Sequence, residues 1–439
     1  MSKERRMEFT EGFQPNGWFD GECKSLKKKK NKVLREEGKS SRRYWALKKE
    51  FKNMCKRKKR QYAQRRTKEL EMLRISSPKE YWKFLRKGFD KNRVINNISA
   101  EKWFSYFQNL VSAPKNMEED GIEEEEEFED ILIRDFLDAN DFLEQEITEM
   151  EVKNRIRYSL RYHKATGLDG ISNDIMKYGI EWIAKPLTNI FNGILRLEYF
   201  PERWNKVIMV PFYKSGDADD PVNYRGISLL GCVGKLFAAV LNRRLSIWIE
   251  DNNYLSIFQG GFRRHRGCSD QSFILVNTIN TVLSKVKRNK VYACFVDFKK
   301  AYDRVQHHLL WKKLQRYGLG EKVINLLKSL YSRVDCAVRV EDEMTNFFQY
   351  LVGVKQGCIL SPLLFNLFIN DLDQMLRDSG IDDGINMGDI VLYILLYADD
   401  IVLISDSTEG LQKFLKVLFS FCEDSQMEEN VKKTQIMIF

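Results

Sequence analysis

The chain has 439 residues, of which 43% are hydrophobic and 12% aromatic, enough for two or three domains at roughly 150 residues each. This composition excludes a disordered polymer and a small disulfide-stapled protein. The net charge of +10 is unevenly spread. Residues 1–93 hold 31 basic and 12 acidic side chains, residues 94–160 hold 6 and 18, and the remainder holds 35 and 32.

The N-terminal part, residues 1–93, is predicted to form a basic helical arm. Its lysine-rich clusters at 27–30 and 56–60 are typical of solvated helix faces or flexible arms. Such charges also attract phosphate backbones, because each cation that meets a phosphate releases counterions. Aromatic residues such as Tyr44 and Trp45 are interspersed. We therefore expect the arm to contact nucleic acid.

Residues 94–150 are predicted to form an acidic linker, with the glutamate run 123–127 at its centre. Just before the linker, Tyr81 and Trp82 follow Pro78 at a spacing that predicts a short packed helix. From Glu151 onward the composition is that of a globular domain with mixed helices and strands.

Periodicity predicts the main elements of this domain. Helices are expected at 186–197, with Ile190, Phe191, Ile194 and Leu195 on one face, and at 235–249, with Leu236, Val240, Leu241 and Leu245 on one face. Strands are expected at 207–211, 291–296, 335–340, 391–397 and 401–405. The last two are separated by only three residues, which predicts a β-hairpin with carboxylates in its turn.

Two acidic sites stand at the ends of apolar strands, where a charge is costly unless it faces a metal or a cleft. Asp297 closes the strand 291–296, and Asp399 and Asp400 lie in the hairpin turn. If the two strands are neighbours, Asp297 and Asp399 converge at one edge of the sheet. Hard divalent cations such as Mg²⁺ prefer carboxylate oxygens. An isolated Asp-Asp is usually a turn, but its combination with the earlier strand-end aspartate is much rarer.

A glycine-containing loop, residues 353–362, leads into an apolar helix predicted at 363–376. Ser361 is the expected N-cap, with Pro362 as the first helical residue. Exposed backbone N–H groups in this loop would let a nucleotide approach closely. The alternative is a simple joint between loop and helix.

Seven sequence blocks, taken in order, resemble the reverse transcriptases of non-LTR (LINE-type) retrotransposons. They are residues 164–171, 210–214, 223–229, 259–263, 295–303, 353–362 and 397–400, and an eighth follows at 430–434. The resemblance covers 151–439 and implies an α+β right-hand polymerase fold. Fingers and an antiparallel palm sheet with packed helices, the core at about 194–439, would follow the basic helical arm.

The same resemblance implies a two-metal catalytic site. The catalytic and metal-binding residues would be Asp297, Asp399 and Asp400, with the backbone carbonyl of Phe298 as a further ligand of two Mg²⁺ ions. The nucleotide-binding residues would be Phe298, Tyr302, Gln356, Arg225, Lys214 and Lys433.

The nucleotide-binding residues have separate implied roles. The ring of Tyr302 would stack on the sugar of the incoming dNTP and clash with a 2′-hydroxyl. Gln356 would line the nucleotide pocket. Arg225 and Lys214 would contact the triphosphate, and Lys433 could donate a proton to pyrophosphate.

The implied reaction is attack of a primer 3′-hydroxyl on the α-phosphate of a dNTP. The expected partners are an RNA template, a DNA primer and dNTPs. The resemblance implies a nuclear location, with a cytoplasmic ribonucleoprotein as the alternative.

Other partners are not expected from the sequence. The eight cysteines lie 22 or more positions apart beside only four histidines, so no zinc site is expected. No apolar run approaches the ~20 residues that span a bilayer, so no membrane partner is expected.

Two departures from the family pattern shape the expectation. Gly226 stands where the family usually has proline, which predicts a looser fingers loop. The chain ends at Phe439, soon after the eighth block, so we expect a truncated reverse transcriptase without a thumb. A non-catalytic remnant that binds nucleic acid through its arm is therefore the alternative function. A group II intron maturase or a telomerase-like polymerase is a weaker alternative.

Overall fold

The computed structural model describes residues 19–38, 41–76, 96–112, 142–285, 290–341, 343–379 and 383–439. The chain divides into two compact units, Met1–Ile95 and Asn96–Phe439. The packed helix predicted after Pro78 and the glutamate run 123–127 lie outside the described residues. Among the described helices, none combines the length and the apolar character that a bilayer crossing requires.

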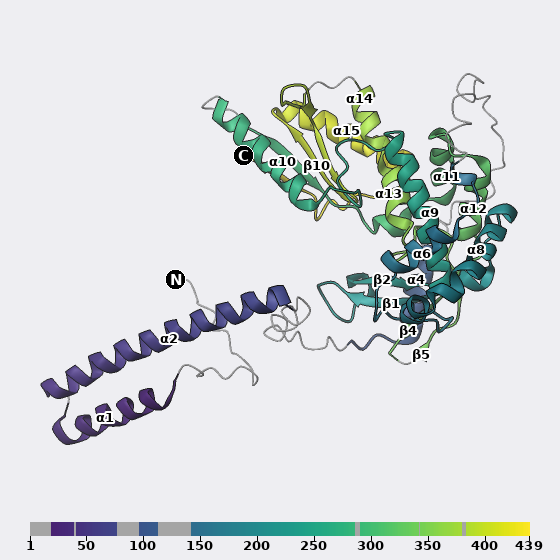
Figure 1. Cartoon of the computed structure of the whole chain (residues 1–439). Helices are drawn as coiled ribbons and strands as arrows, with labels where there is room; N and C mark the ends of the chain where they lie inside the picture. The colour runs from purple at the N-terminus through teal and green to yellow at the C-terminus, as the bar shows by residue number, and fades with distance from the viewer. Residues whose placement is uncertain are drawn as a thin grey trace. The chain divides into compact units, whose positions relative to one another are not determined.

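The first unit contains a pair of basic helices, α1 (Gly21–Glu37) and α2 (Arg42–Ser76), which lie side by side (Figure 1). Asp20 caps α1, because its Oδ1 accepts a hydrogen bond from the Cys23 N–H over 3.1 Å. Lys58 of α2 lies 2.5 Å from Asp20 Oδ2 and 2.7 Å from Glu22 Oε2. These ion pairs link the start of α1 to the middle of α2.

In the residues that the structure describes, the second unit combines helices with three sheets. Its α-helices are α4 (Ala100–Val111), α6 (Glu149–Tyr158), α7 (Asn173–Tyr178), α8 (Ile180–Leu197), α9 (Cys232–Asp251), α10 (Cys268–Lys285), α11 (His307–Arg316), α12 (Glu321–Tyr331), α13 (Ser361–Ile369), α14 (Asp371–Asp378) and α15 (Thr408–Asp424). Its 3₁₀ turns are η1 (Glu202–Trp204), η2 (Pro221–Asn223) and η3 (Ala301–Arg304). Its strands are β1 (Val207–Tyr213), β2 (Tyr224–Leu229), β3 (Tyr292–Val296), β4 (Asp335–Val340), β5 (Glu343–Met344), β6 (Phe348–Gln349), β7 (Ile385–Asn386), β8 (Val391–Leu392), β9 (Ile394–Tyr397), β10 (Asp400–Ser405) and β11 (Gln435–Ile438).

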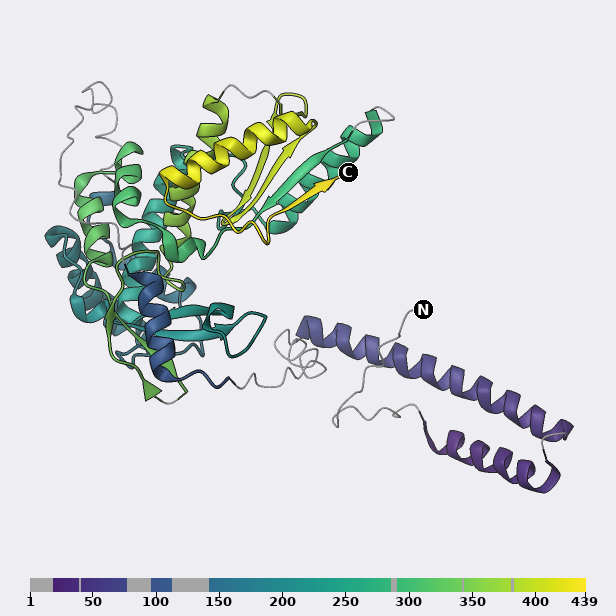
Figure 2. The ribbon, with the colours of Figure 1, turned by 180° about the vertical axis from the view of Figure 1, so that it is seen from behind.

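One sheet has the order β11-β3-β10-β9, with every neighbouring pair antiparallel. Helix α15 packs against β10 and β3 and crosses this sheet in Figure 2. The β9–β10 pair is the predicted hairpin, which confirms that expectation. The strand expected at 391–397 is divided at Tyr393 into β8, which pairs with β7, and β9.

A second sheet has the order β2-β1-β4-β5, with β6 also paired to β4. Strand β1 is antiparallel to β2 and parallel to β4. The looser loop expected at Gly226 is wrong, because this residue lies within β2 opposite Pro211. A Cβ there would come within 2.5 Å of Met209 Sδ and 2.8 Å of Phe107 Cε1, so a larger residue would have to displace these side chains.

Helix α4 packs against β4, although it lies within the stretch predicted to be an acidic linker. Trp103, Phe107 and Val111 form its buried face. Their spacing of four residues is that of one side of a helix. The negative charge of the whole stretch masked this apolar face, so the linker prediction is wrong for α4.

Two further details differ from the sequence predictions. In α8, Phe191, Ile194 and Leu195 are buried as expected, but Ile190 is 47% exposed. The helix expected at 363–376 is divided at Asn370 into α13 and α14. The Asn370 side chain bonds to the backbone of the loop at Tyr254 and Ser256, a tertiary contact that periodicity cannot reveal.

Candidate active site

The three aspartates predicted to be catalytic meet at one end of the β11-β3-β10-β9 sheet. Strands β3 and β10 are neighbours, and Val296 pairs with Ile401. Continuing this antiparallel register brings Asp297 opposite Asp400, and Asp399 precedes Asp400 in the turn. The expected convergence of Asp297 and Asp399 at one sheet edge therefore follows from the observed pairing.

The turn that carries Asp399 is a two-residue hairpin loop. Tyr397 pairs with Asp400, which leaves only Ala398 and Asp399 as the loop. Ala398 has φ 56°, a left-handed conformation that two-residue hairpin loops favour but that costs a non-glycine residue about 1–2 kcal/mol. The surrounding structure must therefore stabilise this conformation.

Asp297 is fixed by the segment that precedes β11. Its backbone N–H donates to Thr434 Oγ1 over 3.3 Å, and its backbone carbonyl accepts from the Asn430 N–H over 2.6 Å. Its Oδ2 accepts from Asn430 Nδ2 over 2.9 Å. The eighth sequence block, 430–434, thus orients the first aspartate.

The electrostatics of the aspartates favour a cation. Burial raises the pKa of Asp399, and the nearby charges of Asp400 and Asp297 raise it further, against the opposing charge of Arg225. A bound cation would relieve this repulsion. Phe298 forms a bridge with Glu429, but the backbone hydrogen bonds of that bridge are made by Asp297 and Lys299. The Phe298 carbonyl accepts no hydrogen bond from any described group.

Carboxylate and carbonyl oxygens are the ligands that hard divalent cations prefer, so this donor set fits such an ion. Within the described residues, however, no three Asp, Glu, His or Cys side chains already surround a single point as a metal-binding group.

Positive side chains gather beside the carboxylates around Lys300. Its Nζ donates to the carbonyls of Tyr224, over 2.8 Å, and Val222, over 3.2 Å. Burial lowers the pKa of Lys300, and the charges of Arg225, Lys214 and Lys433 lower it further, while Asp303 acts in the opposite direction. The charges of the predicted cations Arg225, Lys214 and Lys433 therefore all act on Lys300.

Sequence reasoning missed Lys300 as a member of this group. It lies within the block 295–303, but no sequence pattern distinguishes it from a surface lysine. Its role depends on the carbonyls of β2 and η2, which only the tertiary structure supplies.

Gln356 is held on two sides. Its backbone carbonyl accepts from the Ser228 N–H of β2 over 2.7 Å, and its Nε2 lies 3.4 Å from Asp303 Oδ2. Asp303 is buried, which raises its pKa to about 6, against the opposing charges of Lys300 and Arg225. Asp303 was also missed as a site residue, because its burial cannot be deduced from the motif.

The loop 353–362 corrects two expectations. The N–H groups of Gly353 and Val354 donate to the carbonyls of Val305 and Tyr302, over 2.8 and 2.7 Å, so these two are not exposed to a ligand. Ser361 is not the N-cap of α13, because Leu360 takes that position. The Ser361 hydroxyl instead donates to the Lys355 carbonyl within the loop over 2.8 Å.

Tyr302 presents a packed ring beside the carboxylates. The ring stacks on Phe365 of α13, with centroids 4.6 Å apart and planes 12° apart. Its buried hydroxyl has no hydrogen-bond partner among the described residues. Burial raises the pKa of Tyr302, and the charge of Asp399 raises it further, which places the two side chains in one local field.

Comparison with known proteins decides the family. The family model described as reverse transcriptase (RNA-dependent DNA polymerase) matches residues 214–438. The chain belongs to the reverse transcriptase family. The matched range contains every aspartate and cation of the site described above.

The relatives of this reverse transcriptase come from non-LTR retrotransposons, which confirms the resemblance found in the motifs. The chain is 29% identical over 286 residues to the probable RNA-directed DNA polymerase from transposon BS of Drosophila melanogaster, covering 63% of this chain and 30% of the relative. It is 29% identical over 302 residues to the RNA-directed DNA polymerase from mobile element jockey of the same organism, covering 67% and 32%. The chain thus spans about a third of the length of these relatives.

Among solved structures, apo telomerase from Candida tropicalis, truncated from the C-terminal domain, aligns with a TM-score of 0.41 at 15% identity, covering 57% of this chain and 56% of that chain. The predicted α+β reverse transcriptase fold, with an antiparallel palm sheet and packed helices, is confirmed. Reverse transcriptases generally use divalent metals, which agrees with the donor set at the end of the palm sheet.

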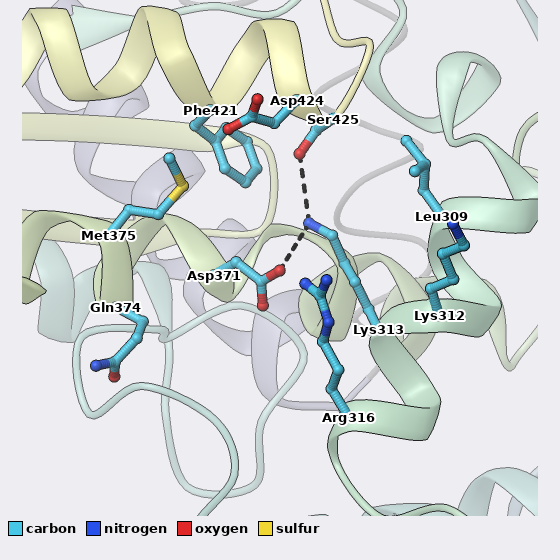
Figure 3. Close-up of a pocket in the computed structure, with 10 residues that line it drawn as sticks. All are labelled: Leu309, Lys312, Lys313, Arg316, Asp371, Gln374, Met375, Phe421, Asp424 and Ser425. Carbon is cyan, nitrogen blue, oxygen red and sulfur yellow. Dashed lines mark hydrogen bonds and ion pairs between the residues drawn. The ribbon is translucent and has the colours of Figure 1, made fainter. Parts of the chain in front are cut away.

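This reverse transcriptase also has a pocket of about 570 Å³ between α11, α14 and α15 (Figure 3). Lys313 projects into it with its Nζ 3.1 Å from Asp371 Oδ2 and 3.3 Å from Ser425 Oγ. The same Nζ donates to the Phe368 carbonyl over 2.7 Å. The residues that line the pocket include none of the aspartate site. Through its partners, Lys313 links three helices by polar contacts.

Proposed function

We propose that this reverse transcriptase chain is an RNA-directed DNA polymerase that adds deoxynucleotides to a primer 3′-hydroxyl on an RNA template. The observation that carries the proposal is the pairing of β3 with β10, which gathers Asp297, Asp399 and Asp400 at one sheet end. Arg225, one of the cations that act on Lys300, also acts on the charge of Asp399. Phosphoryl transfer needs this combination of metal ligands and phosphate-neutralising charges.

The proposed cofactor is a pair of Mg²⁺ ions held by Asp297, Asp399, Asp400 and the Phe298 carbonyl. When bound, two such ions stabilise the attacking and leaving oxygens of the displacement. The protein contributes orientation, because Asn430 holds the Asp297 carboxylate before substrate arrives.

The proposed substrates are dNTPs. Arg225 and Lys214 neutralise the triphosphate, and Lys433 donates a proton to the pyrophosphate. Gln356 lines the nucleotide pocket with its side chain oriented by Asp303. The Tyr302 ring, supported from behind by Phe365, stacks on the sugar and excludes a 2′-hydroxyl.

The proposed partners are the RNA template and the DNA primer, with the helices α1 and α2 as an additional nucleic-acid contact. Lys28 and Lys29 are exposed on α1 and available to phosphates. The proposed site of action is the nucleus, where a fluorescently tagged chain should accumulate.

Primer extension on an RNA template tests the proposal. Asp399→Ala should lower the extension rate by about 10²–10³-fold, the usual effect of removing one group that stabilises transition-state charge. Asp389→Ala, which removes an exposed aspartate outside the site, should extend like the wild type. Equal extension by Asp399→Ala and the wild type would refute the assignment. Binding of primer–template without extension by the wild type would instead support the inert remnant.

A further inference from the structure

A short segment beside the palm sheet contacts the turn that carries Asp399. The N–H of Leu396 in β9 donates to the Phe258 carbonyl over 3.1 Å, and the N–H of Gly260 donates to the Leu396 carbonyl over 2.8 Å. Gln259, between them, forms a parallel bridge with Leu396. The segment therefore continues the sheet beyond β9.

The side chain of Gln259 reaches the turn itself. Gln259 is 1% exposed, and its Oε1 accepts from the Ala398 N–H over 3.0 Å and from the Gly261 N–H over 2.8 Å. Its Nε2 has no partner among the described residues. The side-chain oxygen of Gln259 therefore makes the hydrogen bonds of this amide, as an acceptor.

Gly261 lies against the backbone of the turn at Ala398. A Cβ at this position would lie 2.4 Å from the Ala398 backbone nitrogen, so only glycine lets the two backbones approach. The Gly261 carbonyl accepts from Asn366 Nδ2 of α13 over 2.7 Å. The segment is thus fastened to α13 as well as to the turn.

We propose that Gln259 is a positioning residue of the polymerase site, holding the Ala398 amide and thereby fixing the turn that presents Asp399. The left-handed φ of 56° at Ala398 needs such an external partner, since a non-glycine residue does not favour it. Gln259 would act on the reaction through the Ala398 amide. Its catalytic consequence rests on the proposed function, whereas the hydrogen bond to Ala398 does not.

Hydrogen exchange of the full chain, followed by mass spectrometry and resolved to the Ala398 amide, tests the contact directly. Gln259→Leu keeps the volume but removes the acceptor, so exchange at Ala398 should rise about tenfold. Gln259→Glu keeps an acceptor oxygen and should restore protection. Gln306→Leu, which alters another buried glutamine away from the turn, should leave Ala398 exchange unchanged.

Steady-state kinetics separate positioning from general destabilisation. Gln259→Leu should lower kcat about 10–100-fold, as loss of a group that orients a metal ligand does, while the KM for dNTP stays near wild type. Gln259→Glu should recover most of kcat. Asn366→Ala is a second variant, expected to raise Ala398 exchange several-fold because Gly261 loses its donor.

The outcomes are distinguishable. Unchanged Ala398 exchange in the folded Gln259→Leu chain, or in Asn366→Ala if the first does not fold, overturns the inference whatever the activity. Raised exchange with unchanged kcat in an active enzyme overturns the positioning role. A wild type that cannot extend a primer refutes the proposed function, but the exchange result still decides the contact.

Discussion

Asn430 makes two hydrogen bonds to Asp297 across 133 positions of sequence, one from its backbone and one from its side chain. The side-chain bond, 2.9 Å from Nδ2 to Oδ2, orients a carboxylate that the proposed reaction needs. Hydrogen bonds to charged groups contribute about 1.5–3 kcal/mol. We therefore expect Asn430→Ala to lower the free energy of unfolding by about 2 kcal/mol and to slow primer extension about tenfold or more.

Urea denaturation and primer extension measure the two effects, with the exposed Asn346→Ala as the control. An Asn430→Ala protein with wild-type stability and rate would show that the contact orients nothing.

Asp303 makes stability depend on pH. Burial raises its pKa to about 6 from 3.8, so the folded state binds the proton more tightly than the unfolded chain. The stability contributed by this group is complete below about pH 4 and decreases by about 3 kcal/mol as the pH rises to about 6. We expect Asp303→Asn to be more stable than the wild type above pH 6, and nearly equal to it below pH 4.

Denaturation curves at pH 3.5, 5 and 7.5 check this expectation. The exposed Asp389→Asn is the control. A constant stability difference between Asp303→Asn and the wild type at all three values would contradict it.

Arg244 of α9 is a buried cation that holds the segment before α6. It pairs with Glu151 through Nε and Nη2, over 2.8 and 3.0 Å, and donates to the carbonyls of Leu143, Gln145 and Glu146. Arg244→Met leaves these acceptors unpaired, and we expect it to cost about 3–5 kcal/mol at neutral pH. Arg243→Met, at the adjacent and less buried position, should cost far less.

The Arg244 effect should also depend on pH. Burial acts to raise the pKa of Glu151, but hydrogen bonds from Arg244 and Thr148 outweigh it and lower the pKa below its usual 4.5. The contribution is therefore present above pH 4.5 and is lost as the pH falls further. Thermal unfolding of both arginine variants at pH 7 and pH 3 measures this, and a pH-independent loss would rule the ion pair out as its cause.

Two matched variants of Tyr302 test whether its ring excludes the 2′-hydroxyl of a ribonucleotide. Tyr302→Ala removes the ring, and we expect ribonucleotide incorporation to rise about 10–100-fold relative to dNTP use. Tyr302→Phe keeps the ring stacked on Phe365 and removes only a buried hydroxyl without a described partner. It should keep the selectivity and the stability of the wild type. Single-nucleotide extension with paired dNTP and rNTP measures the sugar selectivity. Equal selectivity in the wild type and both variants would refute the role of the Tyr302 ring in excluding ribonucleotides.

The basic helices predict a salt-dependent affinity for RNA. Replacing the exposed Lys28 and Lys29 by Gln should reduce the slope of log affinity against log salt by about 1.4, or about 0.7 for each phosphate contact on a single strand. Lys58→Gln is the matched control, because Asp20 and Glu22 already neutralise that charge. Fluorescence anisotropy across a salt series measures the slope. An unchanged slope for the double variant would remove α1 from the interface.

Much of the palm sheet could be predicted from local patterns. The strands around Asp297 and the hairpin around Asp399 carry a period-two or continuous apolar signal, and the hairpin turn is only two residues long. The helix of Trp103 and Phe107 was missed, although its spacing is regular, because the acidic charge of the surrounding stretch suggested solvation. Ser361 was misassigned, since its hydroxyl serves a loop carbonyl that cannot be identified from the sequence alone.

The sequence by itself determined the family, the three aspartates and the strand ends on which they stand, because motif order and apolar periodicity are local properties of the chain. Only the tertiary structure decided which side chains serve those aspartates. Carbonyls of β2 and η2 hold the Lys300 ammonium group. Gln259 contacts Ala398, which is 139 positions away in the sequence. Such contacts depend on how strands and helices pack, and packing joins residues whose separation in sequence carries no signal.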